Sequence, residues 1–227
     1  LQELNMVEQF DLRSMGCSTA ESIHMMVEAK KLAFIDREAY MADPDHTDVP
    51  TLGLVSKEYA KERAKLIDPD RAADPTHGDP WVFQGSSGDA GRVTAGSVQE
   101  EDTTCFVIVD RWGNSVCQLQ SIQSSLGSSL VAGDTGILLN NRMTYWHMDA
   151  DHVDSLEPGK RVRHTMNPVM VFQNNPPPNR DTPATRDTNG AQGSQSNGSS
   201  GRNPSRRLVL VCGTPGADTQ VQTNLQV

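Results

Sequence analysis

The sequence has 227 residues, with 20 Lys or Arg against 29 Asp or Glu, which gives a formal net charge of −9. This length is enough for one large domain or two small ones. The acidic balance argues against nucleic acid or an anionic membrane surface as a partner, because phosphate groups would be repelled. The sequence also lacks an apolar run approaching the roughly 18 residues that cross a bilayer.

The opening stretch, LQELNMVEQF, has no initiator Met and no basic segment followed by an apolar one, as a signal peptide would have. We therefore expect the sequence to be a piece of a longer protein, and this end does not indicate a compartment. Four cysteines without a CxxC spacing predict no disulfide framework. Three of them, Cys105, Cys117 and Cys212, lie in apolar runs and are expected to act as small hydrophobic residues.

Two helices are predicted in the first part of the chain. Residues 18–40 follow a helical pattern, with Ser18 and Glu21 as a capping box. The apolar stripe of this helix consists of Ile23, Met26, Val27 and Phe34. A second helix is expected to begin after Ser56 as its N-cap and to end before Asp68-Pro69.

Strand patterns follow from Thr103. Residues 103–109 and 115–121 flank the turn signal DRWGN, which predicts a hairpin. If Val109 pairs with Ser115, the numbers of opposed residues sum to 224, and Thr103 lies across from Ser121. The first strand is apolar on both faces, so we expect a layered sheet covered on both sides. Further strands are predicted at 169–172 and in LVLVCG, residues 208–213.

Two segments have a polar, low-complexity composition. Residues 72–102 are rich in Gly, Pro, Asp and Ser and are predicted to form a flexible surface tail. Residues 174–206 are rich in Pro, Asn, Ser, Gly and Arg and are predicted to be a disordered insert.

Thr103 is a candidate nucleophile if the chain is cut between Asp102 and Thr103. A hydroxyl group holds its proton too tightly to attack at neutral pH, but an N-terminal Thr has its own α-amine as a base. The alternative is that Thr103 is simply a good strand residue. Ser121 could orient the Thr103 hydroxyl, or the two could form an ordinary cross-strand pair.

Three loops offer weaker candidates. GTPGA, Gly213–Ala217, could direct backbone N–H groups at an oxyanion, although such turns are common. WHMDADHVD, from Trp146, does not fit a calcium loop and lacks the helical HxxxH spacing of zinc sites, so a solvated loop is favoured over a metal site. The basic cluster of Arg161, Arg163 and His164 is either an anion subsite or a solvated loop.

Six stretches, in order along the chain, resemble those of the γ-glutamyltranspeptidase family (glutathione hydrolases). They are HMMVEAKKLAFIDREAYMADP, LVSKEYAKERAKLIDPDRA, DTTCFVIVDRWGNSV, GDTGILLNNRM, LEPGKRVRHTMNPVMV and CGTPGADTQ. The resemblance implies an N-terminal-nucleophile hydrolase of the α+β class, with a four-layer αββα sandwich that is incomplete at both ends. Residues 1–102 would then be the C-terminal part of a large subunit, and residues 103–227 the N-terminal part of a small one.

The resemblance also implies roles for individual residues. Thr103 sits where the family has its self-cleaving nucleophile, which places the cleavage site between Asp102 and Thr103. Ser121 takes the place of the assisting hydroxyl, and Gly216 and Ala217 take that of the glycine pair whose amides stabilise the tetrahedral intermediate. No cofactor and no metal are expected.

The implied substrate-binding positions depart from the family pattern. They are Gln123 in place of Asn, Arg142 and Tyr145 in place of Gln and Asp, and His164 with Thr165 in place of a serine pair. A neutral phenol and a nearby cation thus replace the acid that pairs with a substrate ammonium. An ammonium-bearing γ-glutamyl group should bind less well in such a pocket.

The function implied by the resemblance is hydrolysis or transfer of a γ-glutamyl, glutathione-type acyl group through an acyl-threonine ester. Two alternatives are hydrolysis of another acyl amide, as in oxamate or cephalosporin acylases, and an inactive truncated homologue. The expected partners are a small amide substrate and the two subunits of one precursor. The resemblance suggests a periplasmic or extracellular location, with a cytoplasmic one as the alternative. The chain alone is expected to have little or no activity.

Overall fold

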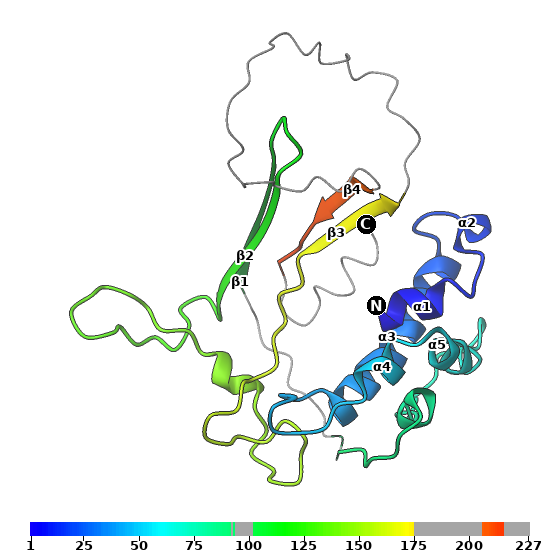
Figure 1. Ribbon diagram of the computed structural model, residues 1–227, viewed down its shortest axis with the longest axis horizontal. Coiled ribbons are helices and arrows are strands. Elements are labelled where there is room, and N and C mark those ends of the chain that lie inside the picture. The colour runs from blue at the N-terminus through cyan, green and yellow to red at the C-terminus, as the bar shows by residue number, and fades with distance from the viewer. Residues whose placement is uncertain (92, 94–101, 175–205, 216–227) are drawn as a thin grey trace, which may run out of the picture.

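The computed structural model describes residues 1–91, 93, 102–174 and 206–215 (Figure 1). Its helices are α1 (Gln2–Val7), α2 (Leu12–Met15), α3 (Ala20–Tyr40), α4 (Thr51–Leu54) and α5 (Lys57–Ala64), with short 3-10 turns η1 (Trp81–Gln84) and η2 (Arg142–Tyr145). The strands are β1 (Asp102–Val109), β2 (Ser115–Gln123), β3 (Val169–Asn174) and β4 (Arg206–Cys212). Apart from the short turn η2, the helices and the strands occupy separate parts of the chain, as is typical of the α+β class. None of the helices within these ranges has the length and apolar character of a membrane span.

Helix α3 begins one residue later than the predicted capping box. The Thr19 hydroxyl accepts a hydrogen bond from the Ser22 amide at 3.1 Å, and the Ser22 hydroxyl accepts one from the Thr19 amide at 3.1 Å. Thr19 and Ser22 therefore satisfy the free amides of the first turn, and the prediction of Ser18 with Glu21 was wrong. The N-cap of α5 is confirmed, since the Ser56 hydroxyl accepts from the Tyr59 amide at 3.0 Å.

The buried face of α3 is not the predicted apolar stripe. Ile23 and Val27 are 43% and 40% exposed, whereas the core of the helical part is built around a different face. This core contains Met6, Val7, Met25, Ala29, Leu32, Ala33, Ala60, Ala64 and Ile67. Helix α1 lies against both α3 and α5, and the alanines of these two helices contribute small side chains to the core that the three helices share.

A buried carboxylate completes the packing of the helical part. Asp36 on α3 is fully buried and accepts hydrogen bonds from the Arg63 guanidinium at 3.0 Å, the Tyr59 hydroxyl at 2.8 Å and the Gly78 amide at 2.8 Å. An apolar-stripe prediction cannot find such a residue, because charged groups enter a core only when partners satisfy them.

Residues 72–91 pack on the helices, which corrects the prediction of a flexible tail for this part of 72–102. The Tyr40 hydroxyl donates to the Gly78 carbonyl at 2.6 Å, and Arg63 donates to the Thr76 carbonyl at 2.8 Å. Trp81 is 7% exposed and lies in a second core cluster with Tyr40 and Tyr59. The contacts are made by backbone acceptors and a single Trp, which composition does not reveal. The predicted insert at 174–206 lies almost wholly outside the described residues.

The predicted hairpin and its register are confirmed. β1 and β2 pair antiparallel from Val109 opposite Ser115 to Thr104 opposite Gln120, so the paired numbers sum to 224. The register shifts between Thr104 and Asp102, which lies opposite Gln123. The two further strands are confirmed as β3 and β4, which form a second antiparallel pair.

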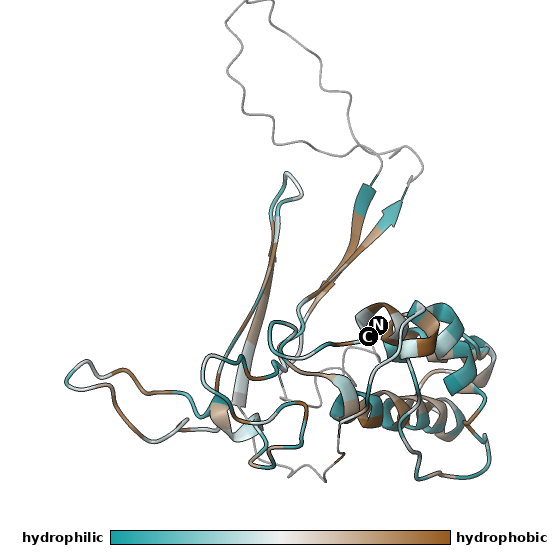
Figure 2. Cartoon of the chain, turned by 60° about the horizontal axis from the view of Figure 1, so that its bottom comes forward, coloured by the Kyte–Doolittle hydropathy of each residue, from teal (hydrophilic) through white to brown (hydrophobic). Residues whose placement is uncertain are grey.

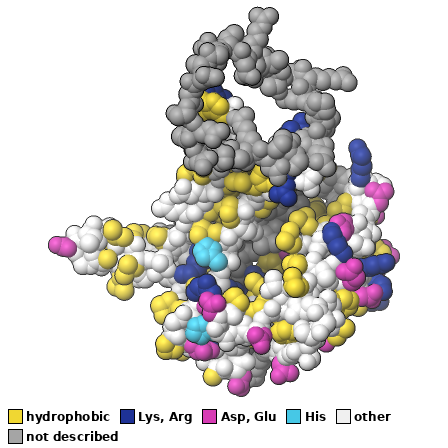
Figure 3. All heavy atoms as spheres, in the orientation of Figure 1, with side chains coloured by type: hydrophobic (Ala, Val, Ile, Leu, Met, Phe, Trp, Pro, Cys, Tyr) yellow, Lys and Arg dark blue, Asp and Glu magenta, His cyan; other side chains and the backbone are white. Residues whose placement is uncertain are grey.

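The prediction that β1 is covered on both faces is not met within the described residues. Ile108 and Val109 are 58% and 53% exposed, and both hairpins are hydrophobic over much of their length (Figure 2). The helices pack on one another and stand beside the hairpins (Figure 1), with acidic and basic side chains interspersed over the helical part (Figure 3). The four-layer sandwich therefore stays a prediction.

Candidate active site

The two candidate hydroxyls meet at the end of the hairpin remote from its turn. The Thr103 Oγ1 donates a hydrogen bond to the Ser121 Oγ at 3.1 Å. Regular pairing ends at Thr104 opposite Gln120, and Thr103 lies within the shift of register between Thr104 and Asp102. The side chains of Thr103 and Ser121 nevertheless meet, as an extension of the register would predict. The Ser121 Oγ accepts a second hydrogen bond, from the Gln123 amide at 3.0 Å. Two donors therefore hold this oxygen in place.

Gln123 ends β2 in a conformation that few side chains adopt. Its φ is +80°, in the left-handed region where a Cβ is unfavourable, and its side chain is 1% exposed. The Gln123 Nε2 donates to the Thr144 Oγ1 at 2.8 Å. The end of β2 is thereby tied to η2.

Arg142 and Tyr145 lie on η2, beside the same end of the hairpin. The Asn141 side chain, at the N-cap of η2, accepts from the Ser124 amide at 3.1 Å and donates to the Ser124 hydroxyl at 2.8 Å. These contacts dock η2 immediately after β2. The sequence alone did not single out Asn141, although an Asn before a short helical turn is a common capping signal.

The remaining predicted substrate-binding residues join this group. The Arg142 guanidinium donates to the Thr165 hydroxyl at 2.9 Å and lies over the Tyr145 ring, 5.2 Å from its centroid. Arg163 also lies over this ring, at 5.3 Å. Burial and the charge of Arg142 both lower the pKa of His164, so its imidazole is neutral at pH 7. Gln123, Arg142, Tyr145 and Thr165 thus connect with the Thr103 end of the hairpin, and His164 adjoins Thr165 in sequence. The roles of all five positions stay predictions.

The GTPGA loop leaves β4 against the same hairpin. A Cβ on Gly213 would lie 2.8 Å from the Cys105 sulfur and 3.1 Å from the Cys117 sulfur, so only glycine fits there. Cys105 is two residues beyond Thr103 in β1. Burial, followed by the neighbouring Cys117, raises the pKa of the Cys105 thiol, which keeps it protonated, as a packing role requires. Gly216 and Ala217 lie outside the described residues.

Residues 1–190 match the sequence model of the Gamma-glutamyltranspeptidase family. The chain belongs to the γ-glutamyltranspeptidase family. The glutathione hydrolase-like YwrD proenzyme of Bacillus subtilis is 37% identical over 177 residues, which are 78% of this chain and 30% of that protein. The oxamate amidohydrolase proenzyme of Klebsiella pneumoniae is 33% identical over 163 residues, 72% of this chain and 27% of that protein.

A solved structure supports the assignment to the γ-glutamyltranspeptidase family. The cephalosporin acylase of Bacillus halodurans is similar with a TM-score of 0.58 at 31% identity, over 74% of this chain and 26% of that one. The chain spans about 30% of the length of the curated relatives it matches. The candidate active site described for this γ-glutamyltranspeptidase-family chain is therefore limited to residues from about 30% of the length of its relatives.

The two arginines of the basic cluster do not form an anion subsite. Arg161 donates to the buried Asp43 carboxylate through its backbone amide at 2.8 Å and through its guanidinium, and Arg163 donates to Glu38 at 2.6 Å. Their partners lie on α3 or just after it, more than 110 residues earlier. Burial alone would raise the pKa of Glu38, but Arg163 and Arg37 lower it below its usual value. The solvated-loop alternative describes Arg161 and His164, which are exposed, but not Arg163, whose side chain is 11% exposed. The acids that pair with both arginines come from the other half of the chain.

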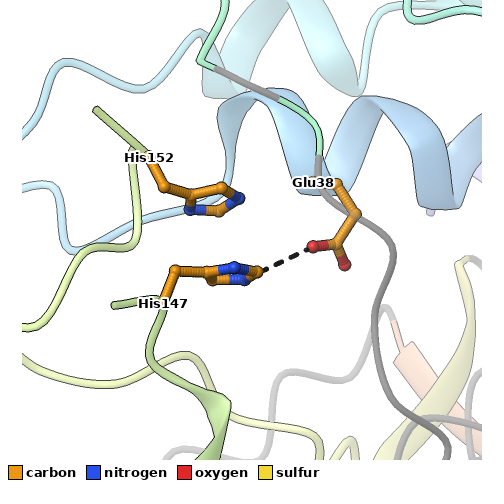
Figure 4. A group of neighbouring side chains, drawn as sticks. All are labelled: Glu38, His147 and His152. Atoms are coloured by element: carbon orange, nitrogen blue, oxygen red, sulfur yellow. Dashed lines mark ion pairs between the residues drawn. The ribbon is translucent and has the colours of Figure 1, made fainter. Parts of the chain in front are cut away.

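The loop WHMDADHVD is packed against α3, where sequence favoured a solvated loop. His147 and His152 are stacked with ring centroids 3.5 Å apart, and His147 Nε2 lies 3.7 Å from Glu38 Oε2 (Figure 4). The three side chains place their potential ligand atoms within 4.8 Å of one another. Sequence analysis did not find this cluster, because Glu38 lies more than 100 residues before the two histidines.

The donor set nevertheless does not suit a cation. The Asp154 amide donates to His152 Nδ1 at 3.0 Å, so the proton of the neutral imidazole is on Nε2. His152 Nε2, which faces Glu38, then has no lone pair to offer to a metal (Figure 4).

The same loop predicts a pH dependence that two single variants should reveal. Burial raises the pKa of Asp154 to about 6, and burial together with His147 lowers the pKa of His152 to about 4. Between pH 4 and 6 the folded protein keeps the Asp154 proton that the unfolded chain loses, so this group makes stability fall as pH rises. His152 has the opposite effect between pH 4 and 6.5, because the unfolded chain binds the proton.

The two effects oppose one another in the natural chain. Asp154→Asn removes the contribution of Asp154, so that of His152 is no longer opposed by it. The free energy of unfolding, measured in urea, should then rise with pH between 4 and 6.5, by up to about 1.4 kcal/mol per pH unit. His152→Gln should give the opposite slope. Equal slopes in both variants would contradict the assignment.

Proposed function

We propose that the complete protein is an amidohydrolase that cuts itself between Asp102 and Thr103 and then uses Thr103 as its nucleophile. The observation that carries the proposal is the hydrogen bond between the Thr103 and Ser121 hydroxyls in a chain of this family. A Thr–Ser contact alone is an ordinary cross-strand pair. Its place at the start of β1, beside the docked η2 segment, supports the catalytic interpretation.

The proposed self-cleavage begins when the Thr103 Oγ attacks the carbonyl carbon of Asp102. The Asp102–Thr103 C–N bond breaks, and its nitrogen takes up a proton to become the new α-amine. The acyl group is then an ester on the Thr103 Oγ, which water hydrolyses to a free Asp102 carboxylate. Residues 1–102 would belong to the large subunit and residues 103–227 to the small subunit.

Turnover repeats the same chemistry on a substrate amide. The α-amine of Thr103 accepts the hydroxyl proton while the Oγ attacks the substrate carbonyl. We propose that the backbone amides of Gly216 and Ala217 stabilise the oxyanion. The amine product leaves with the proton, and water or an acceptor amine releases the acyl group from the ester. No cofactor is required for these steps.

The first substrate class is a γ-glutamyl amide of the glutathione type. A second is an acyl amide without an ammonium group, and the Arg142–Tyr145–Arg163 stack favours it. Two guanidinium groups on a neutral phenol offer no carboxylate to an ammonium, and they would repel one. The relatives include proteins named for glutathione and for oxamate.

The test uses the complete gene product, purified after expression. N-terminal sequencing of the smaller fragment should give Thr-Thr-Cys-Phe, and kcat/KM should be compared for glutathione, a γ-glutamyl anilide and oxamate. Higher kcat/KM with the γ-glutamyl compounds supports the first class, and turnover of oxamate alone supports the second. An uncut product without activity towards any of the three would overturn the proposal and leave the inactive homologue.

A further inference from the structure

We propose that Gln123 is a positioning residue, which fixes the Ser121 hydroxyl through its backbone amide and ties it to η2 through its side chain. The inference rests on the proposed function, because it concerns the hydroxyl pair of that site. It assigns Gln123 a role different from the substrate contact that the family resemblance implies. At 1% exposure, the side chain has almost no surface to present to a substrate.

The backbone contact lies where the chain leaves β2. The Gln123 amide donates to the Ser121 Oγ, two residues earlier, at 3.0 Å, and the chain turns directly after this amide because φ of Gln123 is +80°. Such a conformation at a residue other than Gly costs of order 1 kcal/mol or more, so the surrounding contacts must maintain it. The side-chain bond to Thr144 is one such contact.

The side chain of Gln123 binds Thr144, which is held in place by a further hydrogen bond. The Thr144 Oγ1 accepts from Gln123 Nε2 at 2.8 Å and donates to the Asn141 carbonyl at 3.0 Å. The Asn141 amide in turn donates to the Ile122 carbonyl at 3.3 Å. One residue therefore sets the position of Ser121 and of the segment that carries Arg142 and Tyr145.

This arrangement has a consequence for proton transfer. As the Thr103 Oγ passes its proton to the α-amine, the Ser121 hydroxyl can rotate and donate to the Thr103 oxygen. The Gln123 amide keeps the Ser121 oxygen in place during that rotation. A hydroxyl that accepts a hydrogen bond also becomes a stronger donor, so Gln123 strengthens the contact with Thr103.

The experiment measures the complete gene product and two variants that break the same bond from either side. Gln123→Met keeps the backbone amide and removes the Nε2 donor. Thr144→Val leaves Gln123 unchanged and removes the acceptor, together with the hydrogen bond from Thr144 to the Asn141 carbonyl. Each should lower the self-cleavage rate and kcat about tenfold, with KM changed by less than about twofold. The double variant should be no slower than Thr144→Val alone, because Gln123→Met removes only an interaction that Thr144→Val has already removed.

The matched control is Gln118→Met, an exposed glutamine on the same strand. It should process and turn over like the natural protein. The role is overturned if Gln123→Met matches this control, if it raises KM at unchanged kcat, or if the two single effects multiply in the double variant. An uncut, inactive natural protein would overturn the proposed function and this inference together. A cut natural protein with an unaffected Gln123→Met would overturn only the positioning role.

Discussion

Thr103→Ala should leave the complete gene product as a single uncut chain and lower amide hydrolysis about 10³-fold or more. The variant lacks the oxygen that attacks the Asp102 carbonyl, so neither the ester nor the new α-amine can form. Because processing and turnover use the same oxygen, both should fail together. The measurement is a denaturing gel with intact mass analysis, followed by hydrolysis assays on the substrate found to be turned over.

The matched control for this variant is Thr104→Ala, which removes the adjacent hydroxyl on the opposite, exposed face of β1. It should give two bands and retain activity. Thr103→Ser should also process, since it keeps a hydroxyl opposite Ser121. Cleavage of the Thr103→Ala chain at the same bond would assign the nucleophile to another residue.

The hairpin that holds the site could be predicted in detail from the sequence. Strand periodicity and one turn signal predict the register that is observed from Thr104 to Val109. Extended by one residue, this register predicts the contact between Thr103 and Ser121, which their hydrogen bond confirms. The paired residues are close in sequence. The alternation of side chains along each strand and the position of the turn leave few alternative registers for the hairpin. The shift in register at Asp102, by contrast, has no sequence signal and had to come from the structure.

Contacts between the two halves of the chain could not be predicted in this way. Glu38 and Arg163 are 125 residues apart. The sequence around Glu38 does not indicate that it pairs with Arg163, and the sequence around Arg163 does not indicate Glu38. The buried face of α3 was also mistaken, because its Ala29 and Ala33 and the fully paired Asp36 do not resemble an apolar stripe. Periodicity describes one element at a time, whereas charged partners in a core depend on how the elements meet.

Arg163→Met should weaken the association between the two proposed subunits by about 3 kcal/mol, or roughly 100-fold. Arg163 and Glu38 are both 11% exposed, and the bond of 2.6 Å joins residues on either side of the proposed cut. Without Arg163, Glu38 would keep, among the described residues, the Arg37 guanidinium at 2.8 Å and the His147 imidazole at 3.7 Å. Removing one member of a buried pair is costly because the other remains desolvated. The measurement is subunit dissociation of the processed protein on dilution and in urea.

Arg161→Met provides the comparison, since it alters the same loop two residues earlier. The Arg161 side chain is 65% exposed, and its backbone amide, which the substitution keeps, still donates to Asp43. Solvent screens the exposed guanidinium, and the buried Asp43 carboxylate still accepts hydrogen bonds from the backbone amides of Arg161 and Asp45. The loss of the Arg161 side chain should therefore weaken association less than the loss of Arg163. Equal effects would show that burial of the Glu38 pair does not govern the contact. An Arg163→Met protein that dissociates like the natural one would place the main contact between the subunits elsewhere.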